Sequence, residues 1–154
     1  MHSMKIISHR GNIHGPRPDQ ENNPSYIDAA IALGFDVEID VRYIGGQFYL
    51  GHDAPDHAID IQWFCTRKNV LWVHCKNLDA AYVFIKLKLG IKCFCSISDP
   101  FCFMTQDYLW LNDLETEPKD NCIVPLLNIN DIKCYKFMGK PWGICTDYPV
   151  EIAS

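Results

Sequence analysis

The chain has 154 residues, of which 48% are hydrophobic and 21% are charged, and its formal net charge at pH 7 is −5. This length fits one domain with a substantial core, and an ordinary composition without charge blocks argues against long disordered segments. The acidic balance argues against nucleic-acid binding, which normally requires a basic surface. An anionic substrate would therefore have to be held by a metal ion or by a few placed cations.

The sequence also bears on location and redox state. No apolar run approaches the roughly 20 residues that cross a bilayer, and the N-terminus lacks the pattern of a secretory signal. We therefore expect a cytoplasmic protein without stable membrane insertion. The eight cysteines lack zinc-finger spacing, and most stand in apolar, β-rich segments, which favours reduced, buried thiols.

The first half of the chain alternates expected strands and helices, which is typical of βαβ units with a parallel sheet. Strands are expected at residues 4–8, 35–43 and 70–77. One helix is expected at 25–34, with Ser25 as its N-cap, and another from about Leu78 to Leu89. A turn at Gly45-Gly46 predicts a short hairpin after the second strand.

The second half is more compressed. Strands are expected at 92–98, 107–112, 122–127 and 142–149, but the gaps between them seldom have room for a helix. The segment 133–138 is a poorer candidate for an eighth strand. The whole chain, 1–154, is therefore expected to form one α/β domain, a compact (β/α)₈ TIM-type barrel with several outer helices shortened or missing. Apolar strand surface left uncovered in this way would favour a homo-oligomer.

In such barrels, functional side chains gather at the C-terminal ends of the strands. The unusual polar residues of this chain occupy these positions: His9, Arg10, Glu38, Asp40, His52, Asp53, His74 and Lys76. Glu38 and Asp40 share one face of a strand, where two carboxylates repel each other unless a cation lies between them. Oxygen ligands suit Mg²⁺ or Ca²⁺. The alternative is a half-exposed edge strand with solvated acids.

Two histidines and two cations complete the candidate site. His9 and His52 are acid/base candidates, because imidazole titrates near neutrality. Arg10 and Lys76 suit an anionic group. Taken singly, each of the four also fits a structural histidine or an ordinary surface cation.

Several of these segments resemble the glycerophosphodiester phosphodiesterase family, part of the wider phosphatidylinositol-phospholipase-C-like superfamily. The segments are ISHRG, Glu21-Asn22, FDVEIDV, LGHD and the closing WGICTDYP, in the family's order and approximate spacing. The similarity is strong over residues 5–53, weaker through LWVHCKN and absent from about 92 to 140. A short subgroup of the superfamily, of similar length, looks closer still.

The resemblance implies a barrel that hydrolyses a small-molecule phosphodiester with a divalent metal ion, Mg²⁺ first, with Ca²⁺ or Mn²⁺ as alternatives. On the matching positions, Glu38, Asp40 and Glu21 would lie at the metal with Asn22, His9 would be the base, His52 the acid, and Arg10 and Lys76 the phosphate contacts. The nucleophile is either water or a substrate hydroxyl, and the latter would end at a cyclic phosphate. A binding protein without turnover on the same barrel is the alternative function.

One departure from the family pattern concerns the metal. The family usually has an acidic residue where this chain has His74. His74 either ligates the metal, favouring Mn²⁺ or Zn²⁺ over Ca²⁺, or supports the other ligands while Asp99 or water completes the coordination. A second departure is the compressed second half, which leaves the substrate's identity open.

Overall fold

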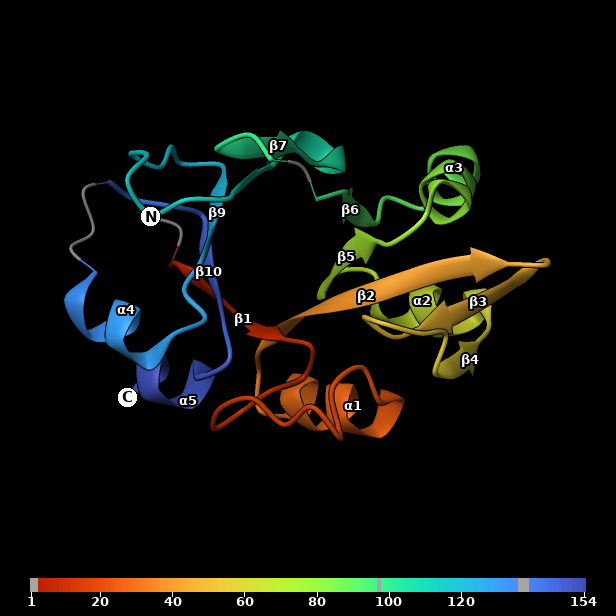
Figure 1. Cartoon of the computed structure of the whole chain (residues 1–154), viewed down its shortest axis with the longest axis horizontal. Coiled ribbons are helices and arrows are strands. Elements are labelled where there is room, and N and C mark those ends of the chain that lie inside the picture. Colours follow the sequence, from red (N-terminus) through yellow and green to blue (C-terminus); the bar gives the residue numbers. More distant parts are fainter. Residues whose placement is uncertain (1–2, 97, 136–138) are drawn as a thin grey trace.

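The computed structural model of the chain describes residues 3–96, 98–135 and 139–154, which form one mixed β-sheet flanked by helices (Figure 1). The strands are β1 Lys5–His9, β2 Asp36–Ile44, β3 Gln47–Leu50, β4 His57–Ile59, β5 Leu71–Cys75, β6 Lys92–Phe94, β7 Phe101–Phe103, β8 Leu109–Leu111, β9 Cys122–Pro125 and β10 Gly143–Thr146. The helices are α1 Pro24–Ala32, α2 Ile61–Arg67, α3 Leu78–Leu87, α4 Ile129–Cys134 and α5 Pro149–Ala153, with a 3₁₀ turn η1 at Thr105–Asp107. The chain is therefore an α/β protein.

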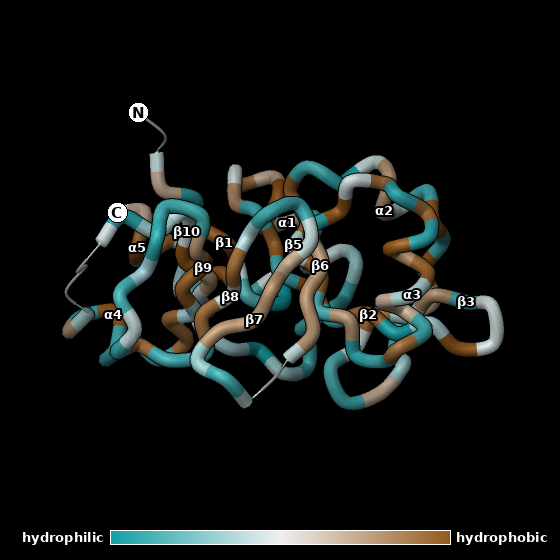
Figure 2. The backbone as a smooth tube through the Cα atoms, turned by 90° about the horizontal axis from the view of Figure 1, so that it is seen from above, coloured by the Kyte–Doolittle hydropathy of each residue, from teal (hydrophilic) through white to brown (hydrophobic). Residues whose placement is uncertain are grey.

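The sheet is mostly parallel. Its parallel strands follow the order β6–β5–β2–β1–β10–β9–β8, while β3, β4 and β7 join it in antiparallel pairs. Figure 1 shows α3 beside the β5–β6 end and α4 and α5 beside the β9–β10 end. In Figure 2 the connecting loops are mainly hydrophilic and the strands mainly hydrophobic, as expected for a sheet that carries the core.

The sheet curls until its two ends approach each other. Buried side chains from both halves pack into one inner cluster, made of Ile7, Trp72, Phe94, Cys102, Met104, Trp110, Ile123 and Cys145. At the ends of the sheet, a single antiparallel bridge joins Phe94 of β6 to Met104, just after β7. Paired strands do not close this sheet into a barrel, so a complete (β/α)₈ barrel stays a prediction.

Strand β2 is buried on both faces. Its outer side chains Val37, Ile39 and Val41 are fully buried in a hydrophobic cluster that also contains residues of α1, α2 and α3. Its inner side chains include Glu38 and Asp40, which are 2% and 0% exposed. The half-exposed edge strand that could have explained these acids is therefore excluded, because β2 pairs with both β1 and β5.

The helix boundaries differ in detail from those predicted. Asn23, not Ser25, caps α1, because its side chain accepts a hydrogen bond from the backbone N–H of Ser25. Asn77 caps α3, which ends at Leu87 with Lys88 in the left-handed conformation. In the described part of the chain, no helix combines the length and the apolar character needed to cross a membrane.

The second half has short helices, as the compressed spacing predicted, but one assignment there was wrong. Residues 133 and 134, offered as part of an eighth strand, are the last residues of helix α4, and Asn128 caps that helix. Residues 136–138 of the same segment lie outside the described residues. The strand β7, the helix α2 and the short strand β4 were not predicted, because each is too short to show a clear periodicity.

Candidate active site

Four neighbouring strands bring the predicted polar residues to one edge of the sheet. The register pairs His9 of β1 with Glu38 of β2, and Asp40 of β2 with His74 of β5. Strand β10 lies on the other side of β1 and ends just before Asp147. Because parallel strands end at the same edge, residues from distant parts of the sequence meet there.

The carboxylate of Asp40 is fully engaged. Its Oδ1 accepts a hydrogen bond from His74 Nδ1 at 3.0 Å, and its Oδ2 accepts one from Asn22 Nδ2 at 2.9 Å. Arg10 Nε lies 3.1 Å from the same Oδ2. Burial alone would raise the pKa of Asp40, but the bonds from His74 and Asn22 and the charge of Arg10 together lower it to about 2. Asp40 is therefore ionised and well compensated.

Glu38 stands in the opposite situation. Its Oε2 is buried and accepts no hydrogen bond from the described residues, and His9 Nε2 lies 3.8 Å away. Burial, followed by repulsion from Asp40, raises the pKa of Glu38 to about 8. A buried carboxylate oxygen without a partner is costly, so this position calls for a further positive charge.

A divalent metal ion fits this position. Glu38, Asp40 and His74 each offer a ligand atom, and these atoms lie within 4.8 Å of one another. Among the described residues, this is the one group of three or more His, Cys, Asp or Glu side chains whose ligand atoms lie so close together. Two carboxylates and an imidazole suit Mg²⁺ or Mn²⁺, and the unpartnered Oε2 of Glu38 is the atom that such an ion would satisfy.

Two further residues had been weighed as metal ligands, and the structure places both outside this group. Glu21 accepts hydrogen bonds from Arg10 Nη1 at 3.0 Å and from Asn12 Nδ2 at 2.9 Å, and it is not part of the close group formed by Glu38, Asp40 and His74. Asp99 is exposed. Glu21 thus orients Arg10, whose backbone lies in the left-handed region with φ 55°.

His9 forms a pair with an acid that the sequence analysis did not single out. His9 Nδ1 donates to Asp147 Oδ1 at 2.7 Å, and Asn12 Nδ2 donates to the same oxygen at 2.8 Å. Burial alone would lower the pKa of His9, but the bond to Asp147 and the charge of Glu38 raise it overall. The signal for Asp147 was available, since it directly follows the last strand in the segment WGICTDYP.

His52 lies in the loop after β3 and also has an acidic neighbour. Its Nδ1 lies 2.7 Å from Asp53 Oδ1, and its backbone carbonyl accepts a hydrogen bond from Arg42 Nη2 at 2.6 Å. His9 and His52 line one pocket of about 340 Å³, together with Arg10, Glu21, Asn22, Asp53, Asp56 and Asp147. Two imidazoles, each held by a carboxylate, thus face the same space.

Lys76 is not in this pocket. It lines a separate pocket of about 310 Å³ together with His74. His74 hydrogen-bonds Asp40, and Asp40 pairs with Arg10 of the first pocket. Asp40 thus contacts one residue of each pocket, and Arg10 is the cation that accompanies the two imidazoles.

Comparison of this chain with protein-family models, with curated proteins and with solved structures finds no match. The geometry of this site is therefore the main indication of what the protein does.

A substitution of His74 tests metal binding by this group without any measurement of turnover. Its Nδ1 is used by Asp40, and its ring stacks on Phe94 with centroids 4.9 Å apart, so only Nε2 is left to bind an ion. We expect His74→Glu to shift the preference from Mn²⁺ toward Mg²⁺ by at least ~10-fold, because a hard oxygen replaces nitrogen. Competition between the two ions, followed by the Mn²⁺ electron paramagnetic resonance signal, measures this without turnover. Equal weakening of both ions would assign His74 to the support of Asp40 instead.

Proposed function

We propose that this protein is a metal-dependent phosphodiesterase acting on a glycerophosphodiester-like substrate. The observation that carries the proposal is that His9 and His52, each paired with a carboxylate, line one pocket beside the buried Glu38 and Asp40. A protein that only binds phosphate has no use for two oriented imidazoles, whereas general acid/base hydrolysis needs one group to accept a proton and one to donate it.

Each polar residue of the site has a separate role in this reaction. Because Nδ1 of His9 donates to Asp147, its Nε2 is free to accept a proton from the attacking hydroxyl. His52, protonated, donates a proton to the departing alcohol. Arg10, held by Glu21 and Asp40, places a planar cation on the pocket wall beside the diester. A divalent ion held by Glu38, Asp40 and His74 would supply stabilisation of the negative charge that develops on the phosphoryl oxygens.

The test of this function is metal-dependent turnover. We expect the purified protein to hydrolyse bis(p-nitrophenyl) phosphate and a soluble glycerophosphodiester in the presence of Mg²⁺ or Mn²⁺, and we expect EDTA to abolish both activities. Phosphorus NMR of the product distinguishes water from a substrate hydroxyl as nucleophile, since only the second ends at a cyclic phosphate. Absence of turnover with Mg²⁺, Mn²⁺ and Ca²⁺ on both substrates would favour the binding protein without catalysis.

A further inference from the structure

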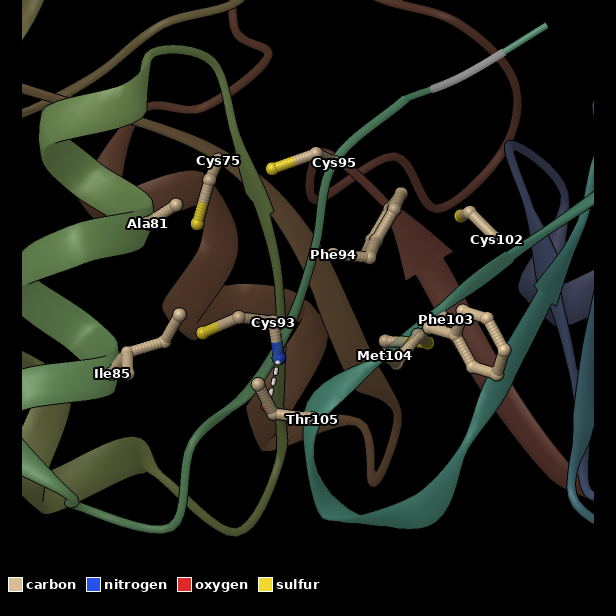
Figure 3. A pocket seen from close by; sticks show the side chains of 10 residues that line it. All are labelled: Cys75, Ala81, Ile85, Cys93, Phe94, Cys95, Cys102, Phe103, Met104 and Thr105. Atoms are coloured by element: carbon tan, nitrogen blue, oxygen red, sulfur yellow. Dashed lines mark hydrogen bonds between the residues drawn. The ribbon is translucent and has the colours of Figure 1, made fainter.

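An apolar pocket of about 430 Å³ lies between helix α3 and the segment around β7, with β6 between them (Figure 3). Helix α3 contributes Ala81 and Ile85 to its wall, and the other side contributes Phe103 and Met104. The pocket opens where the sheet ends meet. There β6 and the segment after β7 are joined by the isolated bridge between Phe94 and Met104 and by the Thr105 hydroxyl, which accepts a hydrogen bond from the Cys93 N–H and donates one to the Ile91 carbonyl. The junction between the two ends of the curled sheet thus contains a pocket.

The rim of this pocket carries apolar side chains that face solvent. Of the lining residues, Phe103 of β7 is 81% exposed and Ile85 of α3 is 61% exposed. Leu78 and Tyr82, on the same helix but not among the lining residues, are 81% and 58% exposed. The three α3 residues are spaced by four and three positions, so they form one stripe along the helix. A contiguous exposed apolar surface beside a cavity is typical of a ligand-binding region.

The apolar pocket adjoins the smaller pocket beside the candidate metal group. It shares Cys75 and Cys95 with the pocket lined by His74 and Lys76. His74 in turn hydrogen-bonds Asp40 of the candidate metal group. Lys76 is half-buried and forms no ion pair with any residue of the ranges 3–96, 98–135 and 139–154, so its ammonium group is available to an anion. A cationic pocket and an apolar pocket thus meet at two shared cysteines.

We infer that these joined pockets bind a single-chain amphiphile, with its phosphodiester head at the candidate metal group next to His74 and Lys76 and its alkyl chain in the apolar pocket. The volume lies at the lower end of the range for small-molecule sites, which suits one chain rather than two. Met104 and the cysteines give the pocket a soft lining that adapts to a flexible chain. The inference rests on the proposed function for the reaction, but binding tests it separately.

The experiment is a calorimetric titration with alkyl phosphocholines, from butyl to decyl, below their micelle-forming concentrations. Each buried methylene should tighten binding by about fourfold until the pocket is full, because every added group removes apolar surface from water. Affinity that does not change with chain length would overturn the inference. Binding that tightens with chain length in the absence of turnover would support this inference and contradict the proposed function. Hydrolysis of bis(p-nitrophenyl) phosphate together with binding that does not depend on chain length would support the proposed function and contradict this inference.

Variants separate the chain pocket from the head pocket. Ala81→Trp fills the apolar pocket and should remove the chain-length dependence, while Ala29→Trp on the exposed part of α1 should preserve it. Lys76→Gln should weaken every member of the series by the same factor and leave the dependence on chain length unchanged. A full dependence on chain length in Ala81→Trp would contradict the placement of the chain.

A second copy of the protein is the competing occupant of the apolar rim. Phe103→Ser removes an exposed aromatic side chain at little expected cost to folding, and Leu33→Ser, at a residue 58% exposed on another surface, is its matched control. We expect Phe103→Ser to weaken decyl phosphocholine at least ~3-fold and to leave the sedimentation coefficient unchanged. Conversion of a dimer to a monomer with unchanged ligand affinity would assign the rim to self-association and overturn the inference.

Discussion

Replacing His9 by alanine should lower turnover of every phosphodiester substrate by at least ~10², because the attacking hydroxyl loses its proton acceptor. His9 Nδ1 is hydrogen-bonded to Asp147, and its Nε2 lies 3.8 Å from Glu38 Oε2, beside the candidate metal group. The measurement is kcat/KM with saturating metal for both an activated aryl diester and an unactivated alkyl diester. His14→Ala is the matched control, since the His14 side chain is 72% exposed and is not one of the pocket residues.

His52→Ala should behave differently, and the difference identifies the acid. An alkyl alcohol must be protonated as it departs, so turnover of a glycerophosphodiester should fall by at least ~10². A p-nitrophenolate leaves without help, so turnover of bis(p-nitrophenyl) phosphate should change little. A large loss on both substrates would show that His52 does not act as the general acid.

The sequence predicted the core of the site because of a simple periodicity. Alternate residues of a strand face opposite sides, so placing Glu38 and Asp40 together required only that residues 35–43 form a strand. The structure has β2 at Asp36–Ile44, with both acids inward and buried. Their burial was also expected, since a strand buried on both faces is typical of parallel sheets.

Other features depend on contacts that no local pattern contains. The pair of His9 and Asp147 joins residues 138 positions apart, and it forms only because β10 is inserted beside β1. Glu21 was placed at the metal by resemblance, but it lies outside the group of Glu38, Asp40 and His74 and accepts hydrogen bonds from Arg10 and Asn12. Tertiary packing decides which hydrogen-bond donor lies within about 3 Å of a carboxylate, so a local sequence pattern does not predict these partners.

The apolar pocket between α3 and β7 was indicated only indirectly by the sequence. The sequence showed too little room for outer helices in its second half, and from this an uncovered apolar surface was predicted. It did not show that β6 and β7 would fail to pair along their length and leave a pocket beside His74 and Lys76. Strand pairing between segments this short depends on the curl of the whole sheet, so it cannot be read from either segment alone.

The metal-free protein should lose stability as the pH rises from about 4.5 to about 8. In this window the folded state holds a proton on Glu38, whose pKa is raised from 4.5 to about 8, while the unfolded chain has released it. The folded state therefore binds more protons, and the free energy of unfolding must fall with increasing pH. His9, whose pKa is also raised, acts in the same direction above its ordinary value of 6.5.

Asp40 produces the opposite trend at lower pH. Its pKa is lowered from 3.8 to about 2, so the stability that it contributes is present above 3.8 and is lost as the pH falls toward 2. The two acids together place the stability maximum of the metal-free protein near pH 4 to 5. If both carboxylates were exposed to solvent, with ordinary pKa values, the stability of the metal-free protein would show no such narrow maximum.

Urea denaturation in EDTA, repeated across this pH range, measures the effect. Since each pKa unit corresponds to about 1.4 kcal/mol, we expect a fall of a few kcal/mol between pH 5 and 8, and we expect Mg²⁺ or Mn²⁺ to reverse it. Glu38→Gln should flatten the profile and abolish the stabilisation by metal, while Asp19→Asn, at an acid with a 66% exposed side chain, should change neither. If Glu38→Gln kept both the fall in stability and the response to metal, the buried carboxylate pair would not be the seat of the ion, and the reaction proposed for this pocket would lose its charge stabilisation.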